Sequence, residues 1–121
     1  MIETVKIIET VLGDLKKVRG VEACAVLSRD GLLIRAILQE GHRYDSFAPM
    51  CATMFGAAET ATTVLGKGIP NRVIAESDHG RLIAVGAGSK ALIIVLVCLD
   101  AELGLILLEL EKAATRLKER R

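Results

Sequence analysis

The chain has 121 residues, of which 51% are hydrophobic and 26% are charged, and its 16 Lys and Arg side chains nearly balance its 15 Asp and Glu side chains. A chain of this length buries roughly two-thirds of the surface that its unfolded form exposes, so residues 1–121 can form one globular domain without disulfides or metals. The net charge of +1, with one Tyr, two Phe and no Trp, argues against nucleic acid as a partner.

The hydrophobic segments are too short to span a membrane, because a transmembrane helix needs about 18 or more consecutive apolar residues. The most apolar run, residues 91–99, is closed by Lys90 and Asp100. The N-terminus lacks the basic and apolar regions of a secretory signal, so we expect a cytoplasmic protein. Three cysteines, an odd number spread through apolar segments, favour reduced thiols. We expect all three in the core: Cys24, Cys51 and Cys98.

Hydrophobic periodicity predicts eight elements in the order αββαβββα, with no internal repeat. Turn residues separate the strands: Asp30 and Gly31 supply the positive φ angles of a tight hairpin, and Gly88 and Ser89 join the last two strands. Residues 41–45 are predicted to form a polar linker. The helices are expected at 2–18, from the capping residue Ser46 to about Leu65, and from near Leu103 onward, and the strands at 21–28, 32–38, 72–77, 81–87 and 90–99.

The last strand determines the predicted topology. Residues 91–99 show no alternation of polar and apolar side chains, so both faces of this strand must be covered and it lies in the middle of the sheet. Short turns make neighbours of consecutive strands, which gives an α+β fold with a five-stranded antiparallel sheet in the order 2-1-5-4-3. The long middle helix is expected alone on one face, with the N-terminal and C-terminal helices on the other.

The middle helix carries more apolar surface than one sheet can bury, and strand 72–77 is an edge with unpaired backbone groups. A second copy related by a two-fold axis covers both features if the edge strands pair and the middle helices pack side by side. We therefore predict a homodimer. One apolar stripe of the helix contains Phe47, Met50, Cys51, Met54, Ala58, Ala61 and Leu65, and the predicted interface contains Met50, Met54, Phe55, Ala58, Arg72, Val73, Ile74 and Ala75.

The motifs that could indicate catalysis lack the residue spacing or the structural context that such activity needs. The glycines of residues 86–90 are out of register for a phosphate-binding loop, and a strand follows them, so they are interpreted as a hairpin turn. The histidines and cysteines lack metal-ligand spacing, and no pair of carboxylates remains for acid–base work once the turn residues are explained. We expect neither enzymatic activity nor a metal or other cofactor.

The order and spacing of these features resemble the Roadblock/LC7 family, in its prokaryotic MglB-like form, from end to end. The matching features are the first helix leading into residues 18–22, the hairpin at 28–32, the long small-residue helix after Asp45, and Gly80 and Gly86 before the apolar last strand. The resemblance implies a sheet sandwiched by helices, and a dimer formed through the middle helix and the third strand into a continuous ten-stranded sheet.

The resemblance also implies a function. Proteins similar to this one regulate or scaffold small Ras-like GTPases, or serve as dynein light chains. We therefore expect a non-catalytic homodimer that binds a Ras-like GTPase through its paired middle helices and shifts the conformational populations of that partner. Two alternatives stay open: a structural adaptor like the dynein light chains, and a small-molecule sensor, which would need a concave apolar pocket with a few polar groups.

Overall fold

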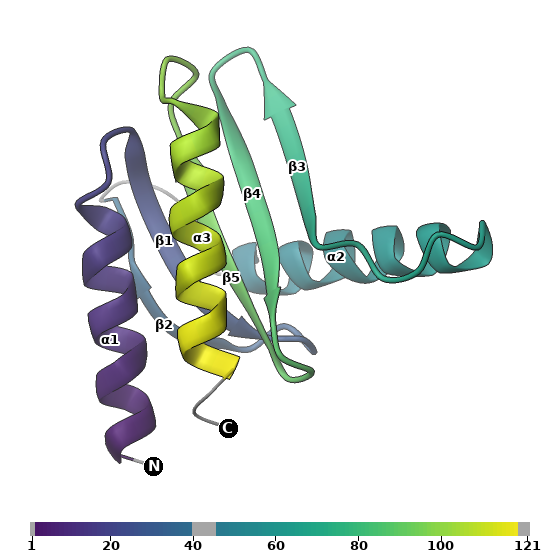
Figure 1. Cartoon of the computed structure of the whole chain (residues 1–121), viewed down its shortest axis with the longest axis horizontal. Helices are drawn as coiled ribbons and strands as arrows, with labels where there is room; N and C mark the ends of the chain where they lie inside the picture. The colour runs from purple at the N-terminus through teal and green to yellow at the C-terminus, as the bar shows by residue number, and fades with distance from the viewer. Residues whose placement is uncertain (1, 40–45, 119–121) are drawn as a thin grey trace.

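The computed structural model describes residues 2–39 and 46–118, and the linker predicted at 41–45 lies outside them. The elements follow one another in the predicted order αββαβββα (Figure 1). Their predicted bounds lie within two residues of the observed ones. The helices are α1 (Ile2–Lys16), α2 (Phe47–Val64) and α3 (Leu103–Lys118), and the strands are β1 (Val21–Ser28), β2 (Leu33–Ile37), β3 (Arg72–Ser77), β4 (Gly80–Ala87) and β5 (Ala91–Val97).

The five strands form one antiparallel sheet in the order β2-β1-β5-β4-β3, which confirms the predicted topology. β5 pairs with β1 on one side and with β4 on the other. Its residues Leu92, Ile93, Ile94 and Val95 are at most 1% exposed. Because adjacent residues of a strand point to opposite faces, this burial requires cover on both faces of the sheet.

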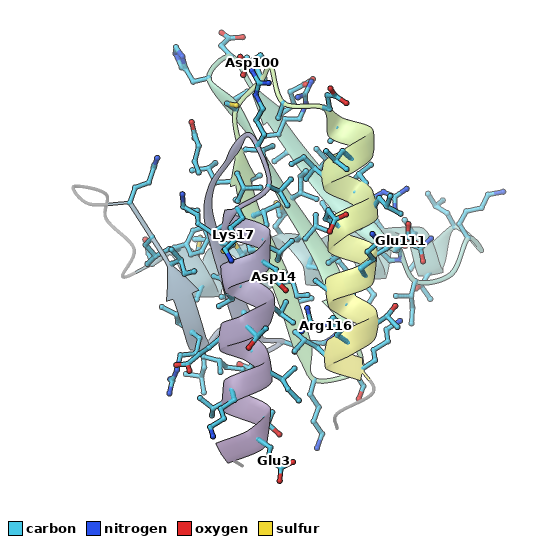
Figure 2. All side chains as sticks on the ribbon, turned by 60° about the vertical axis from the view of Figure 1, so that its left-hand side comes forward. Glu3, Asp14, Lys17, Asp100, Glu111 and Arg116 are labelled. Carbon is cyan, nitrogen blue, oxygen red and sulfur yellow. The ribbon has the colours of Figure 1, made fainter. Side chains whose placement is uncertain are left out.

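Two core layers provide that cover. α1 and α3 lie side by side on one face, and α2 lies alone on the other, as predicted (Figure 1). Leu12, Ile93 and Leu110 belong to the layer under α1 and α3. Figure 2 shows Arg116 of α3 and Asp14 of α1 pointing toward each other, and Nη1 lies 3.0 Å from Oδ2.

α2 covers only part of its face of the sheet. Its buried residues, Ala48, Cys51 and Phe55, all lie in the first half of the helix. The second half runs past β3 and beyond the edge of the sheet (Figure 1). At that end Val64 and Leu65 are 77% and 76% exposed. The most exposed apolar side chains therefore lie at the end of the helix and not in the first half, where the sequence predicted the surplus.

Two local predictions were wrong. Ser46 precedes α2, but its side chain makes no capping hydrogen bond, because its φ of −105° and ψ of 0° are helical and a capping residue needs an extended backbone. Cys98 is half-buried and lies outside the core, because it follows the end of β5 in the turn toward α3. Cys24 and Cys51 are buried, as predicted.

Two glycines provide a matched test of the backbone. Gly20, between α1 and β1, has a φ of +96°, and a Cβ added there would overlap the Cβ of Ala101. We expect Gly20→Ala to lower the free energy of unfolding by about 1–3 kcal/mol. Gly13→Ala places its methyl group in open space on α1 and should raise that free energy by up to about 1 kcal/mol. Urea unfolding followed by circular dichroism measures both, and equal midpoints for the two variants would contradict the expectation.

Candidate interaction surface

The residues predicted for the interface lie on α2 and on β3, one of the two edge strands of the sheet. Met50 is 61% exposed and lies near the β1–β2 turn, where a Cβ on Gly31 would be 3.0 Å from the Cα of Pro49. Met54 and Ala58 are half-buried. Phe55 is only 2% exposed because its ring packs against the sheet of its own chain. Phe55 therefore supports α2 from below and offers almost no surface to another protein.

β3 presents different side chains on its two faces. Val73 is half-buried and packs on the core layer beneath α2, so Val73 and Ala75 face α2. Arg72 and Ile74 point toward the opposite face, on which α1 and α3 lie. Arg72 is exposed and Ile74 is 38% exposed, so α3 leaves this edge of the sheet uncovered.

One flank of α2 carries an apolar stripe that becomes more exposed along the helix. Met54, Ala58, Ala61 and Leu65 recur at helical spacing, and we call them the seam stripe. Met54 and Ala58 are half-buried, Ala61 is exposed, and Leu65 is 76% exposed. Exposure increases because the helix leaves the sheet. The sequence prediction put Ala61 and Leu65 on the same stripe as Met54 but omitted them from the interface.

A second stripe of α2 points away from the sheet. Thr53, Ala57, Thr60 and Val64 are all exposed, and helical geometry places them opposite the buried side that contains Phe55. We call them the outer stripe. The sequence prediction missed it, although Val64 is a large apolar residue that falls outside the predicted stripe.

A hollow of about 400 Å³ lies on the α2 face, over the half of the sheet that α2 leaves uncovered. Leu82 and Leu96, which are paired neighbours on β4 and β5, line it together with Ala75. Polar and charged residues, among them Glu22 and His79, line the rest of the hollow. The hollow is therefore an apolar floor with a polar rim, and it lies beside the edge strand.

A half-buried arginine holds α2 at the place where the helix leaves the sheet. Arg29, in the β1–β2 turn, donates from Nη2 to the carbonyl oxygen of Gly88 at 2.8 Å, and its Nη1 lies 3.3 Å from Oε2 of Glu59 on α2. Its guanidinium stands over the ring of Phe55, 5.3 Å from the centroid. A Cβ on Gly86 would lie 2.7 Å from Nη2. Gly86 thus leaves the space through which Arg29 links two hairpins to α2.

The ionisable side chains supply little reactivity. Burial raises the pKa of the Cys24 and Cys51 thiols to about 11 each, so both stay protonated near neutral pH and are poor nucleophiles. A hydrogen bond with the Asp100 carboxylate is the main cause of the raised pKa of Cys98. In residues 2–39 and 46–118, no three His, Cys, Asp or Glu side chains gather as metal ligands. No helix in the described part of the chain has the length and apolar character needed to cross a bilayer.

A second groove, of about 710 Å³, opens beside the start of β3 and the C-terminal half of α3. Charged side chains of both signs line it, including Arg29, Glu59, Arg72 and Glu111. A small-molecule sensor would need a concave apolar pocket with few polar groups. The mixed charges of this groove do not match that description.

Comparison with known proteins shows the family. The model of the Roadblock/LC7 domain matches residues 7–97. Three proteins of Methanocaldococcus jannaschii, MJ0310, MJ1340 and MJ0714, are 31% or 32% identical over 111 residues, which cover 92% of this chain and 93–96% of each relative. The chain therefore belongs to the Roadblock/LC7 family.

Solved structures show the same fold. MglB of Myxococcus xanthus is similar with a TM-score of 0.87 at 23% identity, over 94% of this chain and 93% of that chain. Profilin IA of Acanthamoeba castellanii shares the fold with a TM-score of 0.63 at 16% identity, over 95% and 96% of the two chains. Roadblock/LC7 proteins are regulatory or adaptor proteins, and membership indicates this functional class for the chain.

The contacts of Arg29 predict a non-additive pair of substitutions. Arg29→Met removes the hydrogen bonds to Gly88 and Glu59, and we expect it to lower the free energy of unfolding by about 1–2 kcal/mol. Gly86→Ala should destabilise the original chain by a similar amount, because the new methyl group displaces the guanidinium. In the Arg29→Met background the same substitution should have a much smaller effect. Urea unfolding of the four chains in this cycle measures the coupling.

The matched control is Arg35→Met. Arg35 forms an ion pair with Glu9 at 3.5 Å, and both side chains are largely exposed, so the loss should stay below about 0.5 kcal/mol. Additive effects of the Arg29 and Gly86 substitutions would show that Arg29 does not occupy the space above Gly86.

Proposed function

We propose that the chain acts in the cytoplasm as a homodimer whose paired α2 helices bind and modulate a small Ras-like GTPase, without chemistry of its own. The seam stripe carries this proposal. It ends in Leu65, which is 76% exposed and directly follows the end of a helix that overhangs its own sheet. Exposed apolar surface of this kind marks a protein–protein interface. The fold similarity to MglB supports the assignment, and one solved MglB structure is described as having a tetrameric arrangement.

A two-fold axis through the middle of β3, perpendicular to the sheet, gives the second copy a definite position. α2 crosses its face of the sheet near the start of β3, where Val73 packs beneath it (Figure 1). The axis places the start of β3 in one copy beside the end of β3 in the other copy. The second copy's α2 would therefore cross near Ser77, where the hollow with Leu82 and Leu96 begins. The overhanging end of each helix would then cover the hollow of the other copy.

The proposed interface keeps most of the residues that the sequence predicted. Met54 and Ala58 lie on the seam between the helices, and the edge strands pair along the residues around Ile74. Phe55 holds α2 in place from inside the chain. The interface residues of the proposal are Met50, Met54, Ala58, Ala61, Leu65, Arg72, Val73, Ile74 and Ala75.

The outer stripe would remain free after such dimerisation. Its members Thr53, Ala57, Thr60 and Val64 are small or apolar and point away from the sheet. Two copies side by side would present a flat platform of these side chains. A platform of this kind can select one conformation of a GTPase and so shift its population, which needs no catalytic residue on the platform.

Leu65→Glu should convert the dimer into a monomer, because the carboxylate would enter the apolar seam with no partner to compensate its desolvation. Leu65 touches little of its own chain, so the circular dichroism spectrum of the monomer should stay unchanged, and its urea midpoint should fall only by the stability that dimerisation adds. Light scattering after size exclusion measures the mass against the 13.0 kDa of one chain. Leu108→Glu, on the 49% exposed side chain of α3, is the control and should leave the dimer intact. A Leu65→Glu variant that remains a stable dimer would contradict the proposal that the seam stripe forms the interface.

The GTPase role is tested with purified small Ras-like GTPases loaded with GDP or with a non-hydrolysable GTP analogue. We expect the dimer to bind one nucleotide state at least about tenfold more tightly than the other, measured by biolayer interferometry. Ala57→Arg on the outer stripe should abolish this binding and leave the mass of the dimer unchanged. Equal affinity for both nucleotide states, or full binding by Ala57→Arg, would reject the proposed platform while leaving the dimer intact.

A further inference from the structure

We infer that Arg72 and Glu76 determine how two copies recognise each other, with Ile74 on the two-fold axis; this inference rests on the homodimer proposed above. β3 begins Arg72-Val73-Ile74-Ala75-Glu76. In antiparallel pairing centred on Ile74, each Arg72 faces Glu76 of the second copy. The strand is therefore complementary in charge to a reversed copy of itself.

The three side chains share one face of the edge. Alternate residues of a strand point the same way, so Arg72, Ile74 and Glu76 all lie on the face that α3 leaves uncovered at this edge. Arg72 and Glu76 are exposed, and Ile74 is 38% exposed. Pairing about Ile74 would create two ion pairs, one on each side of an Ile–Ile contact. The apolar contact in the centre would exclude water from the inner side of each ion pair, while the outer side stays open to solvent.

Glu76 is already oriented within its own chain. Arg81, its pairing neighbour on β4, donates from Nε to Oε2 of Glu76 at 2.6 Å and from Nη1 to the carbonyl oxygen of Leu99 at 3.1 Å. The Arg81 side chain is 19% exposed, whereas the Glu76 side chain is 57% exposed. A carboxylate accepts several hydrogen bonds, so Oε1 can accept one from Arg72 of the second copy. A held carboxylate loses little side-chain entropy when the second guanidinium arrives.

Neighbouring registers fit less well. On a two-fold axis perpendicular to the sheet, the central residue faces its own copy, so the centre can shift to Val73 or to Ala75. A centre at Ala75 would set Ile74 opposite Glu76, and a centre at Val73 would set Ile74 opposite Arg72. Both shifts put an apolar side chain opposite a charge. The centre at Ile74 matches apolar with apolar and cation with anion at each of the positions 72–76.

This charge pattern would make Arg72 and Glu76 specificity residues for self-association. M. jannaschii alone has three relatives of this chain, so several chains of one family can meet in one cell. Chains with the same fold have the same edge strand available for pairing. Charges at two positions of the edge then favour an identical copy and repel a chain with different charges.

Charge reversal tests the inference directly. Arg72→Glu and Glu76→Arg each set like charges opposite one another twice, and each should weaken the dimer by about tenfold or more at low salt. An equimolar mixture of the two variants restores opposite charges at every position, because one copy then carries two carboxylates and the other two guanidinium groups. Native mass spectrometry with one variant tagged should therefore show mixed dimers in excess of the statistical half. Mixed dimers at only that statistical share would overturn the inference.

Disulfide trapping reads the register without reversing a charge. In a Cys98→Ser background, Ile74→Cys should give a covalent dimer under mild oxidation, since the two new thiols face each other across the axis. Ala75→Cys is the matched control and should cross-link at least about tenfold more slowly, because its two copies are offset along the strands. Faster trapping of Ala75→Cys would overturn the centre at Ile74. A monomeric original chain would instead reject the homodimer itself, so the two failures are distinguishable.

Discussion

The length of α2 relative to the width of the sheet is the constraint on which the rest of this structure depends. Its 18 residues span about 27 Å, whereas five strands at about 4.8 Å spacing are about 19 Å from the first to the last. α2 lies across the strands, and the residues that it buries against the sheet are all in its first half (Figure 1). Its second half therefore has no sheet of its own chain to cover, and its apolar flank remains exposed.

The apolar residues on the two faces of the sheet are covered in different ways. α1 and α3 lie side by side and bury their layer within the chain, where Leu12 and Leu110 are at most 2% exposed. On the other face, α2 covers the residues around Leu27 and Ile94 and leaves the hollow at Leu82 open. One chain thus has both an overhanging apolar helix and an uncovered apolar patch. Both features are apolar and both lie on the same face of the sheet. A symmetric pair of copies requires this, because the helix of each copy has to cover the patch of the other.

In the described part of the chain, the buried thiols and Arg29 serve the fold itself. The buried thiols keep raised pKa values, and Arg29 is occupied by Gly88 and Glu59 in holding α2 to the sheet. This surface offers a defined shape, because α2 is held to the sheet at its middle by Phe55 and Arg29 and extends past the sheet at its C-terminal end. A protein built in this way can act on a partner through contact area and rigidity, which is the regulatory or adaptor class that the family indicates.

The amino-acid sequence determined the elements, their order and the topology of the sheet. Those features follow from periodicity and turn residues, which are local, and from the unbroken apolar run of β5, which admits only a central place. The sequence also indicated a surplus of apolar surface on α2 and an edge at β3. Only the tertiary structure decided where the surplus lies, because exposure depends on the angle at which α2 crosses the sheet. That angle arises from contacts between residues distant in sequence, such as Arg29 with Glu59 and Gly88, and it moved the exposed surface from the region of Phe55 to Leu65.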